Sequence, residues 1–241
     1  MKRILVVQSR TIPERAERER ANYTRTIGDA AQLDFLSALD EKLSWTSPEE
    51  LLARYDGVIF GGSADFYFDG GREEKDPARL VSFIILSRVR NMISYAMVSG
   101  FPILGVCFGH QIIAQSRVGE VKSDPEQSKT GSFEVALTKE GKRDKLFGKL
   151  PPKFYAQYEH KDSATELPRG ATLLGSAPNC RFSILKYGDN AYTVQFHPEV
   201  ERLYGVESYE HHDSQDASRI IPLWIEHVVG RGSLTPRKAK G

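Results

Sequence analysis

The sequence predicts a single α/β domain with a mostly parallel central sheet, helices on both of its faces, and antiparallel strands added in its second half. In the first half, apolar runs of strand length alternate with helical patterns. In the second half, several strand-like segments follow one another with short turns between them. We expect one domain, because no linker-like stretch separates the two halves.

The chain begins with strand and helix signals in turn. Residues 3–7 (RILVV) are typical of a buried strand, and residues 13–27 are polar and compatible with a helix. Within them, the mixed-charge run 14–20 (ERAERER) is interpreted as a solvated helix face. A short apolar segment follows at about 33–39. The tetrapeptide SPEE at 47–50 then predicts a helix start, with its serine as N-cap and its last glutamate completing a capping box.

Two further strand–helix pairs complete the first half. Residues 57–60 (GVIF) form a strand that ends at a Gly-Gly-Ser loop, and the helical pattern of 80–98 stops before Gly100. Residues 103–106 form the next strand, and a helix begins at about residue 108. Strands that alternate with helices indicate parallel pairing through right-handed crossovers.

In the second half of the sequence, strand-like segments follow one another without helices between them. Its strand-like segments are 133–137, 154–158, 171–177, 181–187 and 191–196. A helix near 218–229 follows them. We therefore expect the domain to span residues 1–229, and residues 230–241 (GRGSLTPRKAKG) to form a basic, disordered tail with no synthase domain after it.

The composition limits the possible partners. The 241 residues are 40% hydrophobic and carry a formal net charge of +1, so nothing in the charge favours nucleic acid or a membrane surface. No segment reads as a membrane span or a signal peptide, and the two cysteines make no disulfide framework, so we expect the protein in a reducing cytoplasm.

The adjacent histidines within 209–213 (YEHHD) lack a spaced third ligand, so we expect no metal. No phosphate-binding loop is present, and we expect no cofactor.

The pentapeptide GVCFG at 105–109 has the spacing of a nucleophile elbow, a sharp turn from a strand into a helix. Small residues two positions either side of Cys107 allow the tight bend. The geometry would raise the sulfur above the carboxyl edge of the sheet, at a helix N-terminus whose partial positive charge favours a thiolate. From the pentapeptide alone, a buried structural cysteine remains an equal alternative.

A thiolate nucleophile needs a base and a group that orients the base. The segment QFHPE at 195–199 supplies His197 and, two residues later, Glu199 directly after a strand. Acyl chemistry also needs donors for the developing oxyanion. The backbone N–H groups of Phe108, just after the cysteine, and of Gly62, in the loop after another strand, are the candidates. A turn with a surface ion pair is the plainer interpretation of QFHPE taken alone.

These motifs resemble the class I glutamine amidotransferases. The elbow GVCFGHQ, the segment QFHPE and the GGS loop occur in the order of that family, and so does the EHKD segment at 159–162 followed by LPRG at 167–170. The similarity covers about residues 4–229 and is strongest to free-standing domains like the glutaminase half of GMP synthase. The resemblance implies a flavodoxin-like sheet with its pocket at the carboxyl ends of the strands.

The resemblance also implies roles for single residues. Cys107, His197 and Glu199 would form a catalytic triad that hydrolyses the glutamine side-chain amide through a γ-glutamyl thioester. The family pattern places Gln111 at the amino-acid end of the substrate, together with Gly61, Ser63 and the backbone of a loop containing Gly131 and Ser132. Ser63 departs from the proline that many members have after Gly-Gly.

The substrate is left open by these motifs, because a triad alone does not fix it. The leading hypothesis is a glutaminase whose ammonia passes to a separate synthase chain. The second is a hydrolase of γ-glutamyl peptides or conjugates that uses the same triad. The third is a binding module without activity, which the intact triad disfavours.

Overall fold

We describe the fold from a computed structural model, which covers residues 1–41, 45–63, 77–206 and 208–231. Its main sheet has nine strands in the order β2-β1-β3-β4-β11-β10-β9-β6-β7, and a second sheet pairs β5 with β8. The strands are β1 (Lys2–Gln8), β2 (Ala31–Ser37), β3 (Gly57–Phe60), β4 (Ile103–Val106), β5 (Val121–Ser123), β6 (Lys129–Leu137), β7 (Lys153–His160), β8 (Asp162–Ala164), β9 (Ala171–Ala177), β10 (Cys180–Tyr187) and β11 (Ala191–Val194).

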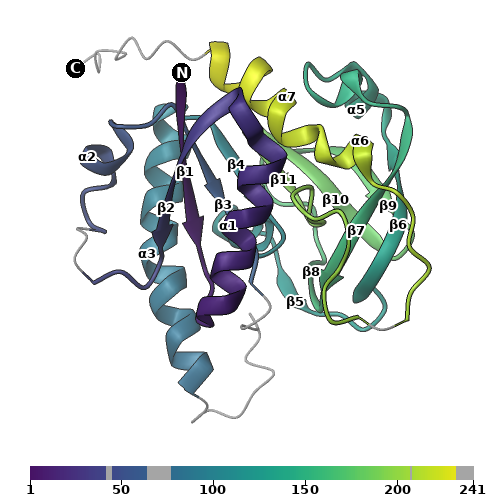
Figure 1. The fold of residues 1–241 in the computed structure, drawn as a ribbon, viewed down its shortest axis with the longest axis horizontal. Helices are drawn as coiled ribbons and strands as arrows, with labels where there is room; N and C mark the ends of the chain where they lie inside the picture. The colour runs from purple at the N-terminus through teal and green to yellow at the C-terminus, as the bar shows by residue number, and fades with distance from the viewer. Residues whose placement is uncertain (42–44, 64–76, 207, 232–241) are drawn as a thin grey trace.

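The described helices connect and cover these strands. They are α1 (Pro13–Ile27), α2 (Pro48–Leu52), α3 (Pro77–Ser99), α4 (Phe108–Ser116), α5 (Lys139–Arg143), α6 (Gln215–Ser218) and α7 (Ile220–His227), with 3-10 turns η1 (Gly28–Ala30), η2 (Phe147–Lys149) and η3 (Val229–Arg231). Figure 1 shows α1 and α7 on the near side of the sheet and α3 behind it. Helices therefore cover both faces, as predicted.

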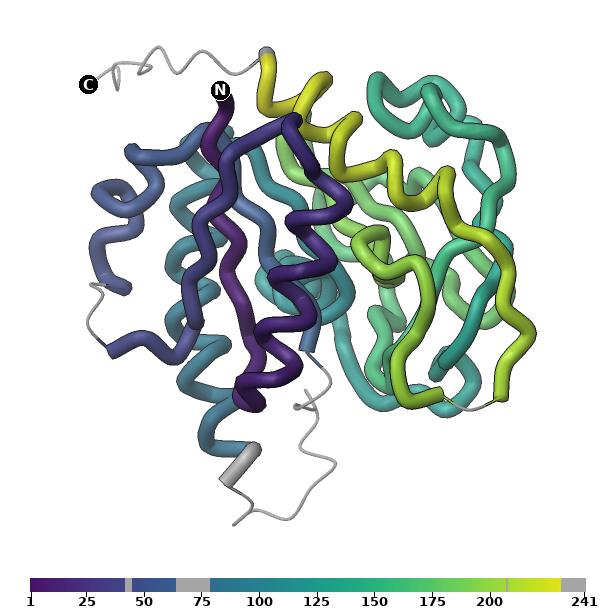
Figure 2. Tube along the Cα trace, in the orientation of Figure 1, coloured from purple at the N-terminus to yellow at the C-terminus, as the bar shows by residue number. Residues whose placement is uncertain are grey.

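The sheet is parallel in one part and antiparallel in the other. β2, β1, β3, β4 and β11 are parallel neighbours, whereas β10, β9, β6 and β7 are each antiparallel to the strand before them in the sheet order. Figure 2 shows the same division along the chain, with the purple and blue first half on one side and the green second half on the other. The predicted α/β class with antiparallel additions is confirmed.

Alternation along the buried strands divides the core between the two faces. Ile4 and Val6 of β1 pack with Trp224 of α7, whereas Leu5 and Val7 pack with the cluster that includes Ile93 of α3. Successive side chains of a strand point to opposite faces, so a strand buried on both sides must be apolar throughout. This is why RILVV could be recognised as a central strand.

Helix α3 is long enough and apolar enough to cross a membrane, by length and composition alone, over Arg79–Ser99. This differs from the expectation that no segment could span a membrane. In the fold, Ile85, Val89, Met92 and Ile93 of this helix are buried in the core. Packing of one helix face on the sheet accounts for these residues, whereas Leu80, Phe83, Ile84 and Val98 of the same helix are exposed.

Several local predictions were wrong. Ser47 precedes α2 but its side chain makes no capping bond, because its ψ of 63° lies outside the extended region that a capping box needs. Residues 130–132, expected in a loop, lie inside β6, where pairing with β7 starts at Lys129. In place of one helix near 218–229, the structure has α6 and α7. Pro222 has no N–H, so the helical hydrogen bond to the carbonyl four residues earlier, at the end of α6, cannot form. The η3 turn (Val229–Arg231) overlaps the first residues of the expected tail, and residues 232–241 lie outside the described part, so the boundary stays a prediction.

Candidate active site

The turn at Cys107 has the geometry of a nucleophile elbow. Cys107 follows β4 directly and precedes α4, with a φ of 50° and a ψ of −101°. A non-glycine residue with positive φ is strained and persists only where the surroundings hold it. A Cβ on Gly109 would lie 2.1 Å from the carbonyl oxygen of Phe60, so only glycine lets α4 approach β3 this closely. The strain and the packing both place the sulfur at the carboxyl edge of the sheet.

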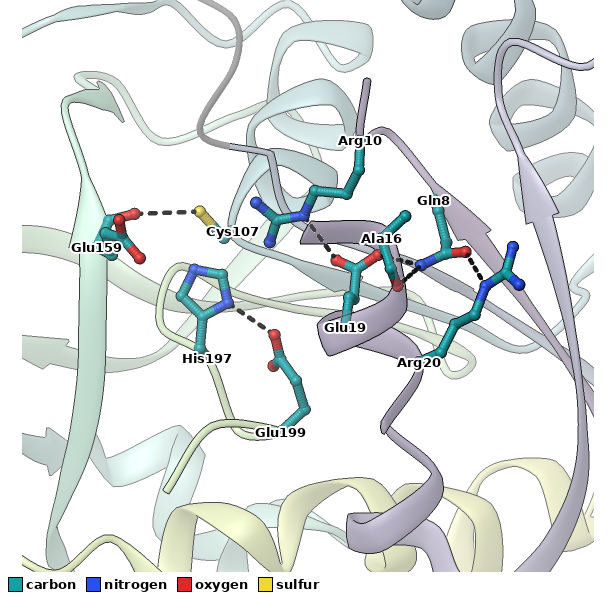
Figure 3. Close-up of polar contacts among 9 residues, drawn as sticks. All are labelled: Gln8, Arg10, Ala16, Glu19, Arg20, Cys107, Glu159, His197 and Glu199. Carbon is teal, nitrogen blue, oxygen red and sulfur yellow. Dashed lines mark hydrogen bonds and ion pairs between the residues drawn. The ribbon is translucent and has the colours of Figure 1, made fainter. Parts of the chain in front are cut away.

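His197 and Glu199 follow β11, the strand next to β4. The Nδ1 of His197 lies 2.8 Å from Oε1 of Glu199, and both side chains are almost fully buried. The backbone N–H of His197 donates to the carbonyl of Gln157 at 2.8 Å, which fixes the segment against β7. Figure 3 shows the imidazole with one nitrogen toward Glu199 and the other toward the sulfur of Cys107. The structure thus brings together the three residues of the predicted triad.

The electrostatics of His197 favour the imidazolium. Burial lowers its pKa, but the charges of Glu199 and of the Cys107 thiolate, with hydrogen bonds to both, raise it well above the usual value. The pKa rises because opposite charges on both sides of the ring stabilise its protonated form. The imidazole can therefore hold a proton between the carboxylate and the sulfur.

Gly62 lies against both of the reacting side chains. A Cβ at this position would be 2.7 Å from Cε1 of His197 and 3.4 Å from Cβ of Cys107. The loop is anchored on two sides, because the N–H of Gly61 donates to Val7 at 3.0 Å and its carbonyl accepts from Gly109 at 3.2 Å. Ser63 is the last residue described before the gap at 64–76.

The predicted oxyanion donors occupy suitable elements. Phe108 is the first residue of α4, so its N–H lies at the N-terminal end of that helix, directly after Cys107. Gly62 lies beside the cysteine, in the loop after β3. Both groups flank Cys107 at the end of the parallel strands, where ligands of open α/β sheets bind.

The other predicted substrate contacts are engaged with the protein itself. The side-chain amide of buried Gln111 donates to the carbonyl of Asp162 at 2.6 Å and to Oε1 of Gln195 at 3.3 Å. The hydroxyl of Ser132 donates to Oε1 of Gln157 at 2.9 Å and accepts from the N–H of His212 at 3.0 Å. Within the described residues, no group of three His, Cys, Asp or Glu side chains is arranged to hold a metal.

A polar network beside the triad is not recognisable in the sequence. Glu19 of α1 is buried, and its carboxylate accepts from Nε of Arg10 at 3.3 Å and from Nε2 of Gln8 at 2.9 Å. Burial raises the pKa of Glu19, an effect that Arg10 and Gln8 counteract. A Cβ on Gly61 would lie 2.9 Å from its Oε1. The interpretation of ERAERER as a solvated face is therefore wrong for Glu19, which faces the site (Figure 3).

A cavity of about 390 Å³ opens beside His197. Its lining residues come from the start and middle of α1, from β7 and from the segment after β11: Arg10, Arg15, Arg18, Glu19, Asn22, Glu159, His197, Glu199, Val200, Arg202, Leu203, Tyr204, Gly205 and Val206. Four of these residues are arginines. Arg15 and Arg18 belong to the mixed-charge run of the first helix, which by pattern alone indicates a solvated face, whereas Arg10 and Arg202 lie outside that helix.

Comparisons with known proteins identify the family of the chain. The sequence model of the family described as glutamine amidotransferase class-I matches residues 71–205. The chain is 37% identical over 145 residues to a subunit of "GMP synthase [glutamine-hydrolyzing]" from Methanocaldococcus jannaschii, and the match covers 56% of this chain and 74% of that protein. It is 34% identical over 171 residues to the subunit of the same name from Methanothermobacter thermautotrophicus, covering 70% and 79%.

Solved structures show the same fold. A Thermoplasma acidophilum protein assigned as a GMP synthase subunit superposes with a TM-score of 0.70 at 22% identity, over 95% of each chain. A glutamine amidotransferase from Thermotoga maritima superposes with a TM-score of 0.59 at 23% identity, over 83% of this chain and 76% of that one. At these identities the likeness supports the fold alone, which is the flavodoxin-like α/β fold expected from the sequence.

Proposed function

Because the chain belongs to the class I glutamine amidotransferase family, we propose that it hydrolyses the side-chain amide of glutamine with Cys107 as nucleophile, His197 as acid and base, and Glu199 as the group that orients the imidazole. One observation carries this proposal. His197 bonds to the buried carboxylate of Glu199 at 2.8 Å through Nδ1 and presents its other nitrogen to the cysteine. That is the arrangement by which a thiol is activated and a leaving amine is protonated.

The first half of the reaction forms a thioester. The sulfur of Cys107 attacks the amide carbon of glutamine, and the carbonyl oxygen becomes an oxyanion that accepts hydrogen bonds from the N–H groups of Phe108 and Gly62. The imidazolium of His197 donates its proton to the amide nitrogen. The carbon–nitrogen bond breaks, ammonia leaves, and a γ-glutamyl thioester remains on the cysteine.

The second half releases glutamate. Neutral His197 takes a proton from a water molecule, which attacks the thioester carbon, and the second oxyanion occupies the same pair of N–H donors. The carbon–sulfur bond breaks, and the thiolate and imidazolium are restored. Glutamine and water are thus converted to glutamate and ammonia, and Glu199 stays hydrogen-bonded to the ring throughout.

We propose that the ammonia is used by another chain. The relatives from Methanocaldococcus and Methanothermobacter are each named as one subunit of a glutamine-hydrolysing GMP synthase, and that name supports a separate synthase chain as the partner. The alternative, hydrolysis of γ-glutamyl peptides or conjugates, uses the same thioester. It is favoured by the cavity beside His197, which is larger than ammonia requires.

The proposal is tested by measuring ammonia and glutamate released from glutamine by the purified chain. Cys107→Ala should abolish the release, whereas Cys180→Ala, which removes the other buried thiol, should retain it. Equal turnover by Cys107→Ala and the unaltered protein would refute the assigned nucleophile.

A further inference from the structure

The cavity beside His197 borders the residue that would protonate the leaving group, and Cys107 is not among its lining residues. The proposed proton donor to that group is the imidazole of His197, which lines the cavity together with Glu199 and Val200. Ammonia needs roughly the volume of one water molecule, about 30 Å³. A space of about 390 Å³ is instead within the range of ordinary small-molecule sites, roughly 300–1,000 Å³. The cavity therefore has room for a leaving amine much larger than ammonia.

The charged residues that line the cavity indicate which charge a leaving amine bound there would carry. Two of its three carboxylates already have cationic or imidazole partners within the site, since Glu19 bonds to Arg10 and Glu199 bonds to His197. The third, Glu159, is exposed. Besides Arg10, which pairs with Glu19, three guanidinium groups line the cavity, and guanidinium forks are suited to binding carboxylates.

Arg10 is held in place before any ligand binds, and Arg18, which is exposed, lies on the exposed ring of Tyr204. Arg10 is half-buried and fixed by Glu19, and its Nη2 would lie 3.3 Å from a Cβ on Gly62, next to the proposed oxyanion donor. Arg18 stacks over the ring of Tyr204 with its Cζ 3.9 Å from the ring centroid. Preorganised cations lose little conformational freedom on binding an anion, so they contribute more to affinity. Figure 3 shows Arg10 between Cys107 and Glu19.

From this cavity we infer that the site accepts γ-glutamyl amides whose leaving amine carries a carboxylate, that is, γ-glutamyl dipeptides. The inference rests on the proposed function, because it uses the same thioester and the same proton donor. Cys107 attacks the γ-carbonyl carbon, the carbon–nitrogen bond to the second amino acid breaks, and His197 protonates the departing α-nitrogen. Water then releases glutamate. The carboxylate of the second amino acid is bound by Arg10 and Arg18.

The test compares kcat/KM for three substrates on the full chain: γ-glutamylglycine, γ-glutamylglycinamide and glutamine. We expect γ-glutamylglycine to be cleaved at least tenfold better than its amide, which has the same size without the charge. In Arg18→Gln, the ratio of kcat/KM for γ-glutamylglycine to that for glutamine should fall about tenfold, the effect of losing one charge-assisted hydrogen bond. Arg54→Gln, an exposed arginine away from the cavity, should leave the ratio unchanged.

Failure of the inference and failure of the proposed function give different results. If glutamine is cleaved but the peptide and its amide are cleaved equally, or the ratio is unchanged in Arg18→Gln, the inference is overturned and the glutaminase stands. If Cys107→Ala cleaves either substrate as well as the unaltered protein, the proposed chemistry is overturned together with the inference. A ratio that falls equally in Arg54→Gln would also contradict the role of the cavity.

Discussion

Replacing Glu199 by glutamine removes a charge from the site without changing the shape of the side chain. In the structure, Oε1 of Glu199 lies 2.8 Å from Nδ1 of His197, and the carboxylate is 1% exposed, so solvent screens the interaction little. Hydrogen bonds to charged groups contribute about 1.5–3 kcal/mol. Because the bond stabilises the imidazolium that protonates the leaving amine, its loss should reduce kcat/KM for glutamine by about tenfold to a hundredfold.

The same substitution should change the pH dependence in a defined direction. Burial alone would lower the pKa of His197, and the charges of Glu199 and Cys107 raise it well above 6.5. Without the carboxylate, the imidazolium loses its proton at lower pH, so the alkaline limb of kcat/KM should move to lower pH. The raised pKa also stabilises the native protein fully below the unfolded value and less as pH rises through the folded value. The stability difference between the two proteins should therefore shrink as pH increases.

The assay is continuous detection of ammonia across pH, with urea unfolding at the same pH values. Glu201→Gln is the matched control, since Glu201 is two residues away, exposed, and paired with Arg25. We expect it to leave both the rate and the pH profile unchanged. An alkaline limb that stays at the same pH in Glu199→Gln, or a loss of rate equalled by the control, would refute the role of Glu199.

Three other substitutions or reagents test the site. Gly62→Ala should lower kcat/KM at least a hundredfold with little change in Tm, because the added methyl would meet the ring of His197 at 2.7 Å; near-normal activity would contradict the described geometry. Gly109→Ala should instead reduce the free energy of unfolding by roughly 1–3 kcal/mol or more in urea titration, because its methyl would overlap a backbone carbonyl at 2.1 Å. A diazo-ketone analogue of glutamine should label Cys107 and leave Cys180 unmodified, because burial raises the pKa of Cys180 to about 12; equal labelling by mass spectrometry would count against the assignment.

The parallel half of the sheet was predictable because its strands are buried on both faces. Residues 3–7, 57–60 and 103–106 are continuous apolar runs, and each lies within or coincides with an observed strand. The three-residue strands β5 and β8 were missed because their residues, VKS and DSA, carry no apolar period. The start of β6 was taken for a loop because Gly131 weakens a strand signal, although the pairing with β7 continues through it.

The site was predictable where its residues are adjacent in the sequence. The elbow around Cys107 and the segment containing His197 and Glu199 each form a local pattern, and the order of the strands then brings the two together across β4 and β11. Arg10 and Glu19 could not be found in this way. They belong to a polar run whose inward-facing members are decided by how α1 packs on the sheet, and not by the run itself.

The central claim is a covalent bond between Cys107 and the γ-carbonyl of glutamine, and mass spectrometry of the protein quenched with acid during turnover tests it directly. We expect an adduct with the mass of one glutamyl group on the peptide that contains Cys107, formed only when glutamine is present and absent in Cys107→Ala. Ammonia release at full rate with no such adduct at any quenching time, or an adduct on the peptide that contains Cys180, would contradict the account.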